Sequence, residues 1–174
     1  MLYSFDNKRP TIGKESYVSD TALVIGDVRI GNNCYIGHGA ILRGDYGTIE
    51  VGDGTAIEEG VVVHAPPEGM CSIGKKVTVG HGAIIHSKSI GDMSVIGMGA
   101  VLSVRAELGE RSVAGEGAVV KADQKIPAGK VAVGNPARVV REVSSKDTNF
   151  WGFGKQFYID LARKYLAIGM HRVD

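Results

Sequence analysis

The chain has 174 residues, with 20 lysines and arginines against 19 aspartates and glutamates. This length suits one domain with a substantial core, and the near-neutral charge argues against a protein that binds nucleic acid or an anionic membrane. The two cysteines are too few for a disulfide scaffold, and the polar segment 1–10 lacks the apolar stretch of a secretion signal. No apolar run reaches the roughly 18 residues of a membrane span. The sequence therefore predicts a cytoplasmic protein with no membrane-spanning segment.

Glycine is frequent, at 25 residues, and its spacing is regular because the sequence repeats every six residues. The repeat is marked by aliphatic residues, each with a small residue at a fixed offset: Ile12, Val18, Val24, Ile30, Ile36, Leu42, Val51, Ile57, Val63, Ile73, Val79, Ile85, Ile90, Ile96, Leu102, Leu108, Ala114 and Val120. A six-residue period is typical of a β-helix, in which three strand-and-corner units close one coil. We predict an all-β fold, a left-handed parallel β-helix of hexapeptide repeats with a C-terminal α-helix, rather than a β-sandwich with glycine-rich turns.

The register places coil starts at residues 12, 30, 51, 73, 90 and 108 and breaks after Val120. From about Asp147 the period becomes helical, with Lys155, Arg163 and Lys164 on the expected solvated side. The apolar side of this helix is expected to contain Phe150, Phe153, Phe157, Leu161, Tyr165 and Ile168. We predict a β-helix domain over residues 1–141, including an N-terminal cap and a closing segment. Residues 142–174 should form a helical segment that packs on the β-helix or on a neighbouring subunit.

Three of the five histidines fall at related positions of this register. His64 and His86 follow the third-strand markers of consecutive coils, so they occupy one slot about 4.8 Å apart. His81 lies on the preceding strand, around a corner of the triangular coil. One chain therefore offers two ligands on one face and a third elsewhere, whereas a ring of three chains brings His81 of one to the histidine pair of the next. The sequence predicts a homotrimer with a metal site at each subunit interface.

Three neutral imidazoles that leave one coordination position open are typical of a catalytic zinc site. The pKa of a water bound there falls toward about 7, which gives a metal-bound hydroxide near neutral pH. Such a hydroxide suits attack on carbon dioxide, or on an ester or thioester carbonyl. We expect Zn²⁺, although Fe²⁺ and Co²⁺ fit the same ligands. A lone surface histidine is more often ordinary polar surface, so the metal prediction depends on the shared slot.

Three segments of the chain resemble the γ-class carbonic anhydrases: residues 42–45 (Leu-Arg-Gly-Asp), 60–64 (Gly-Val-Val-Val-His) and 80–86 (Gly-His-Gly-Ala-Ile-Ile-His). The similarity extends over nearly the whole chain, and the spacing of the histidines is its most specific part. The resemblance implies a trimer with zinc or iron at the subunit interfaces. It implies that the metal ligands are His64, His81 and His86.

The same resemblance assigns further residues to the site. It implies that Arg43 and Asp45 form a pair beside the metal and across the subunit boundary, and that Tyr158 lies nearby. The chain departs from the family pattern in having Glu58-Glu59 where many relatives carry Gln-Asp, and in a short loop at 65–71 where some carry a long acidic one. Carbon dioxide hydration requires export of a proton, for which Glu58 and Glu68 are the carboxylates at hand.

We therefore expect a carbonic anhydrase, a lyase that reversibly hydrates carbon dioxide to bicarbonate by metal-bound hydroxide. A thioesterase that uses the same hydroxide is a related alternative. Another is a hexapeptide-repeat acyltransferase, in which one histidine acts as the general base and no metal is needed. A third is a metal-binding trimeric scaffold without significant turnover. Sensitivity to metal removal separates the metalloenzymes from the acyltransferase.

Overall fold

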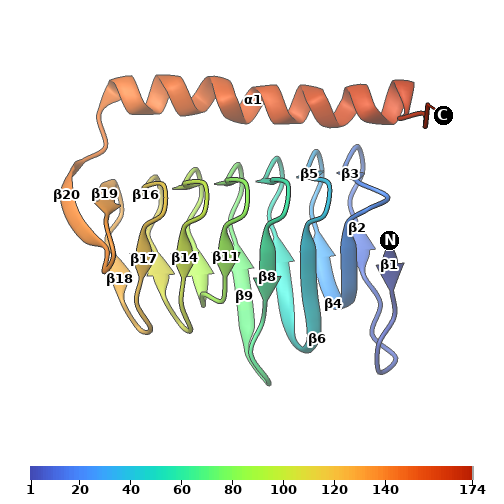
Figure 1. Cartoon of the computed structure of the whole chain (residues 1–174), viewed down its shortest axis with the longest axis horizontal. Coiled ribbons are helices and arrows are strands. Elements are labelled where there is room, and N and C mark those ends of the chain that lie inside the picture. Colours follow the sequence, from blue (N-terminus) through green and yellow to red (C-terminus); the bar gives the residue numbers. More distant parts are fainter. Residues whose placement is uncertain (174) are drawn as a thin grey trace.

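The chain folds into a parallel β-helix of triangular cross-section, described over residues 1–173 by a computed structural model (Figure 1). The first face contains β2 (Thr11–Ile12), the second half of β4 (Leu23–Ile30) and of β6 (Ile41–Val51), β9 (Met70–Ile73), β12 (Ser89–Ile90), β15 (Glu107–Leu108) and β18 (Lys125–Ile126). The second face contains β3 (Tyr17–Val18), β5 (Tyr35–Ile36), β7 (Ala56–Ile57), β10 (Thr78–Val79), β13 (Val95–Ile96), β16 (Val113–Ala114) and β19 (Lys130–Val133). The third face contains β1 (Leu2–Tyr3), the first half of β4 and of β6, β8 (Val62–His64), β11 (Ile84–Ile85), β14 (Val101–Leu102) and β17 (Val119–Val120).

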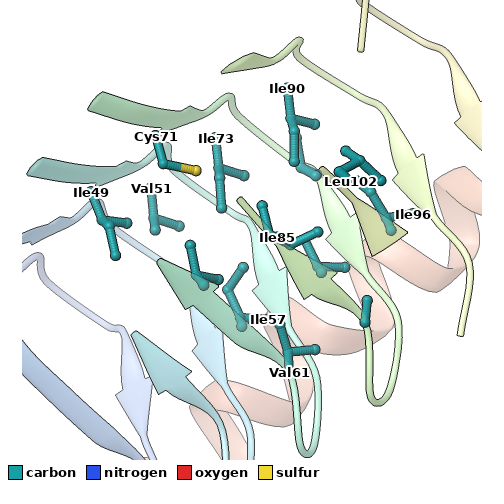
Figure 2. Packing of buried hydrophobic residues seen from close by; sticks show 14 of the residues in the cluster. Ile49, Val51, Ile57, Val61, Cys71, Ile73, Ile85, Ile90, Ile96 and Leu102 are labelled. Carbon is teal, nitrogen blue, oxygen red and sulfur yellow. The ribbon is translucent and has the colours of Figure 1, made fainter. Parts of the chain in front are cut away.

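The six-residue markers lie in register from coil to coil and point inward. On the third face, for example, Leu42 pairs with Val63, and Ile85 pairs with both Val63 and Leu102. These side chains are fully buried, and Figure 2 shows such residues from successive coils aligned in one core. Burial of aliphatic surface in this column stabilises the coils, at roughly 1.5–3 kcal/mol for each large side chain. The predicted β-helix is confirmed.

The solenoid continues past the point where the sequence predicts that it breaks. Ile126 pairs with Leu108 on the first face, and Ala132 pairs with Ala114 on the second, so a partial seventh coil is present. The prediction of a break after Val120 was wrong because prolines and a changed spacing hide the repeat there. The strand β20 (Arg138–Glu142) then turns back antiparallel to β19 and closes this end of the sheet.

The outward side chains differ from face to face. The first face carries an outward polar column of Arg29, Glu50, Ser72, Ser89, Glu107 and Lys125. The third face carries an outward column that is wholly aliphatic, which we name the aliphatic stripe: Leu23, Ile41, Val62, Ile84, Val101 and Val119. Every member of the stripe is at least partly exposed, and Ile84 is 49% exposed. The second face is covered in part by the helix.

The helix α1 (Ser145–Ile168) runs along the solenoid and returns toward the end that carries β3, so both chain ends lie at the same end of the molecule (Figure 1). Its N-cap is Ser144, where a capping box forms: the Ser144 side chain accepts from the Asp147 N–H, and the Asp147 carboxylate accepts from the Ser144 N–H. Across residues 1–173, no helix is both long and apolar enough to cross a membrane.

The buried side of α1 differs from the predicted one. The three phenylalanines expected inside, Phe150, Phe153 and Phe157, are 53–77% exposed. The predicted solvated residue Lys155 is only 4% exposed, and its amino group donates to the Thr78 hydroxyl and to a backbone carbonyl. Leu161 and Tyr165 pack against the solenoid, and Arg163 and Lys164 are exposed, as predicted. The prediction was wrong for the phenylalanines, for Ile168 and for Lys155, whose amine is drawn inward by polar groups of the second face. The spacing of apolar residues along the helix does not reveal such hydrogen-bond partners.

Candidate metal centre

Two of the three predicted metal ligands lie side by side at the end of the third face. His64 ends β8 and His86 follows β11, and the paired strands bring their ring centroids to 4.7 Å at an interplanar angle of 38°. Both residues are half-buried. The pKa of His64 is lowered, first by burial and then by the neighbouring Arg43 and His86. Neutral imidazole, the form that binds metals, is therefore favoured here.

Arg43 and Asp45 extend this pair by one coil. Arg43 is the register partner of His64, as its slot predicts. Its guanidinium donates to Asp45 at 2.7 Å, and the other Asp45 oxygen lies 3.7 Å from His64 Nε2. Burial acts to raise the pKa of Asp45, but hydrogen bonds from Arg43 and from the Tyr46 N–H outweigh it and lower the pKa. A fixed carboxylate and a cation thus flank the histidine pair.

His81 lies around the corner, beyond the end of β10 on the second face, between two carboxylates. Its Nδ1 is 2.8 Å from Glu59 Oε2, and its Nε2 is 3.1 Å from Glu58 Oε2. The backbone N–H of His81 also donates to Glu58. Glu59 occupies the slot of His81 one coil earlier, so the stacking of coils brings the two side chains together. Among residues 1–173, His81 and the histidine pair do not form one group of possible metal ligands within a single chain.

The sequence is similar to proteins of known name. A mitochondrial γ carbonic anhydrase 1 from Arabidopsis thaliana is 36% identical over 172 residues, which cover 95% of this chain and 62% of that protein. A carbonic anhydrase from Geobacillus kaustophilus is 33% identical over 174 residues, which cover 100% of this chain and 96% of that protein. The chain belongs to the γ-carbonic anhydrase-like family. The resemblance seen in the three sequence segments is confirmed, although the chain spans about three fifths of the length of the Arabidopsis relative, 62%.

Repeat families and solved structures agree with this membership. Residues 9–44 match the family described as bacterial transferase hexapeptide (six repeats), and residues 27–65 and 71–103 match the hexapeptide repeat of succinyl-transferase. A crystal structure of a hexapeptide transferase family protein from Anaplasma phagocytophilum aligns with a TM-score of 0.90 at 34% identity. The alignment covers 94% of this chain and 97% of that one. The chain therefore shares its solenoid with hexapeptide-repeat proteins.

The histidine pair of this γ-carbonic anhydrase-like protein fits a metal ion. His86 Nε2 is buried without a hydrogen-bond partner in the part of the chain described, the one buried side-chain nitrogen or oxygen there to lack one. An unpaired buried polar atom costs about 1–3 kcal/mol, and a bound metal would remove that cost by taking the lone pair. Among residues 1–173, no group of three possible ligands within one chain forms a metal site. A third ligand from a second chain is the arrangement that the register predicts.

The side of His81 that carries Glu58 opens onto a cleft of about 330 Å³, whose lining includes Met98 and Trp151. Tyr158, on α1, lines the same cleft, and its hydroxyl forms a hydrogen bond with Glu58. The pKa of Glu58 is raised, chiefly because the carboxyl group is buried. The structure thus brings Glu58 to one ring nitrogen of His81, and Tyr158 to Glu58.

Glu68 lies apart from this group. It is exposed on the turn after β8, where its backbone N–H donates to the Tyr46 carbonyl. Within the described residues, its side chain forms no hydrogen bond or ion pair with the three histidines. Sequence reasoning also missed Tyr35, whose hydroxyl donates to Glu59 at 2.6 Å. The slot shared by Glu59 and His81 pointed to their contact, but nothing in the sequence pointed to Tyr35.

Proposed function

We propose that the protein is a γ-carbonic anhydrase that reversibly hydrates carbon dioxide at a metal site shared between chains of a homotrimer. His64 and His86 of one chain and His81 of the next would hold Zn²⁺, with Fe²⁺ or Co²⁺ as substitutes. When bound, such an ion acts as a Lewis acid and lowers the pKa of a coordinated water, which supplies a nucleophile at neutral pH. The observation that carries the proposal is the stacked histidine pair with its buried, unpartnered His86 Nε2.

The aliphatic stripe supports the homotrimer. Of the three solenoid faces, one is partly covered by α1 and one is polar, whereas the third exposes a continuous aliphatic column beside the histidine pair. Contiguous exposed apolar surface of this kind marks a protein interface. Because the third histidine stands at a different corner of the same chain, a ring of copies that covers the stripe would also complete the site.

The remaining residues of the site have distinct roles in this proposal. Asp45 is held in place by Arg43 at one oxygen and by the Tyr46 N–H at the other, so Oδ1 stays beside His64 and can orient a polar group of the substrate. The Arg43 cation, which is 44% exposed in the single chain, would attract the bicarbonate anion. Glu58 Oε2 would accept the proton that hydration releases, while the hydroxyl of Tyr158 steadies the carboxylate.

A metal-free acyl transfer is the second candidate, because hexapeptide transferases share the fold at 34% identity. That reaction needs one histidine as a general base, and His81 between two carboxylates is oriented for this role. The two functions differ in their response to metal removal. Acyl transfer would persist in a chelator, whereas carbon dioxide hydration would be lost and would return with added zinc.

The test is stopped-flow hydration of carbon dioxide by protein prepared without oxygen and loaded with zinc or ferrous ion. We expect turnover in the wild type, its loss in His81→Ala, and its retention in His171→Ala, a control at an exposed histidine of the C-terminal tail. Hydration at the buffer rate by a fully metal-loaded wild type would leave the metal site intact but refute the assigned reaction.

A further inference from the structure

The surroundings of His81 raise a question that the three-histidine site does not answer. A histidine that binds a metal through one ring nitrogen almost always donates an N–H from the other to a carboxylate or carbonyl, which fixes the ring and its tautomer. Here both ring nitrogens face carboxylates, Glu59 at Nδ1 and Glu58 at Nε2. One carboxylate must therefore hold the ring, and the other must stand on the metal side.

The two carboxylates are distinguished by what lies around them. Glu58 and His81 both line the cleft of about 330 Å³, so the ring nitrogen that faces Glu58, Nε2, lies at the cleft, with Glu58 Oε2 3.1 Å away. Glu59 is not part of that lining, and both of its oxygens are engaged: Oε2 with His81 Nδ1 and Oε1 with the Tyr35 hydroxyl. Glu58 is hydrogen-bonded too, by the His81 N–H and the Tyr158 hydroxyl, so the cleft is what distinguishes the two carboxylates. Glu59 lies away from the cleft, and we take it as the carboxylate that anchors the ring, through Nδ1.

Tyr35 is itself held firmly. Its side chain is 2% exposed and packs among three other tyrosines: ring centroids lie at 5.7 Å from Tyr17, 5.2 Å from Tyr158 and 6.2 Å from Tyr165. A ring packed in this way keeps its hydroxyl in one place, and the hydroxyl meets Glu59 at 2.6 Å. Tyr35 and Glu59 are 24 residues apart in sequence, and the stacking of adjacent coils brings them together.

We propose that Tyr35 and Glu59 are a positioning pair that holds the His81 ring by its Nδ1, so that Nε2 is presented to a metal on the neighbouring chain. The proposal rests on the function proposed above. Glu59 accepts the Nδ1–H and thereby selects the tautomer with a free lone pair on Nε2. Tyr35 donates to the second oxygen and prevents Glu59 from rotating away. Neither residue touches the substrate.

The pair is tested by the zinc affinity of the trimer, measured by competition with a chromophoric chelator. Loss of such a supporting hydrogen bond typically weakens metal binding by about 10–100-fold. We expect about 10-fold weaker binding in Tyr35→Phe, a loss at least as large in Glu59→Gln, and no more than about a two-fold change in Tyr17→Phe. Tyr17 is the matched control, because its ring stacks in the same cluster but its hydroxyl hydrogen-bonds to Ser19 instead of Glu59.

A second variant set separates positioning from a general effect on packing. If Tyr35 acts through Glu59, the double variant Tyr35→Phe/Glu59→Gln should bind zinc no more weakly than Glu59→Gln alone. The visible spectrum of the Co²⁺-substituted protein should shift in Tyr35→Phe and stay unchanged in Tyr17→Phe. Additive losses, or equal losses in both tyrosine variants, would overturn the pair.

The outcomes also separate this inference from the proposed function. A wild type that binds no zinc overturns both, whereas a wild type that binds zinc as tightly as Tyr35→Phe overturns only the pair. Should Tyr35→Phe fail to form trimers, ¹⁵N spectra of the zinc-loaded wild type decide the matter. A protonated Nδ1 on His81 supports the pair, and zinc bound to Nδ1 refutes it.

Discussion

Replacing Ile84 with glutamate should dissociate the proposed homotrimer. Ile84 stands in the middle of the aliphatic stripe and is 49% exposed in the single chain. Burial of its exposed half is worth roughly 1 kcal/mol for each subunit, or roughly 3 kcal/mol for the trimer, at the usual value for an isoleucine. Burying an unpaired carboxylate in its place costs several kcal/mol more at each interface. Association should weaken by at least about 100-fold.

Sedimentation velocity over a range of protein concentrations measures the effect directly. Ile84→Glu should sediment as a monomer where the wild type is a trimer, with an unchanged far-ultraviolet circular dichroism spectrum because the substituted side chain points out of the core. Ser89→Glu is the matched control, since Ser89 is half-buried in the outward column of the polar first face. A trimer of Ile84→Glu with wild-type affinity would refute the assignment of the stripe as the interface.

Three further predictions concern the solenoid and its helix. Burial lowers the pKa of Lys155 from 10.5 to about 8. Between these values the unfolded chain binds more protons than the folded one, so the free energy of unfolding rises with pH, by on the order of 3 kcal/mol in total. Urea denaturation should show this rise in the wild type but not in Lys155→Met. Gly97→Ala should lower the melting temperature, because the added carbon would lie 2.4 Å from a backbone nitrogen of the next coil. Gly152→Ala should instead stabilise the protein by about 0.5–1 kcal/mol, because Gly152 is helical and nothing beyond its own stretch of helix lies within 4 Å of the added carbon. The opposite order of the two effects would contradict the packing described. Finally, a thiol reagent should label neither Cys34 nor Cys71 until the protein unfolds. Both cysteines are fully buried, and burial raises the pKa of Cys71 to about 11. Rapid labelling of the native protein would contradict this burial and would show that the coils open.

The β-helix was predictable because one inward residue in every six is a strong and local signal. Ile12, Ile30 and Val51 stack as the period requires, and so do the later markers through Val120. The signal failed where the chain leaves the ideal repeat. Around Ile126 a proline-containing stretch hid a further coil, although its inward residue is buried in register. A search for the six-residue period finds coils that keep the repeat, and it misses a further coil whose sequence departs from it.

The site was predictable to the extent that it follows from register. The shared slot placed Arg43, His64 and His86 together, and the structure pairs them. Contacts that depend on side-chain reach were not predictable, such as the hydrogen bond from Tyr35 to Glu59. The spacing of apolar residues on α1 likewise could not predict that Lys155 is buried while the phenylalanines are exposed. The burial of Lys155 depends on a hydroxyl and a carbonyl of the solenoid that accept hydrogen bonds from its amine.

Subunit complementation would show whether each metal site is built from two chains. His81→Ala and His64→Ala trimers each lack a complete site, but a trimer that mixes them contains one intact pairing of His81 with His64 and His86. After the two variants are unfolded together in equal amounts and refolded, we predict about one tightly bound zinc for every four chains, from random assembly of a three-fold ring. Each variant alone should bind almost none. Zinc binding by either variant alone at the wild-type level, or none in the mixture despite mixed trimers, would contradict a site shared between subunits.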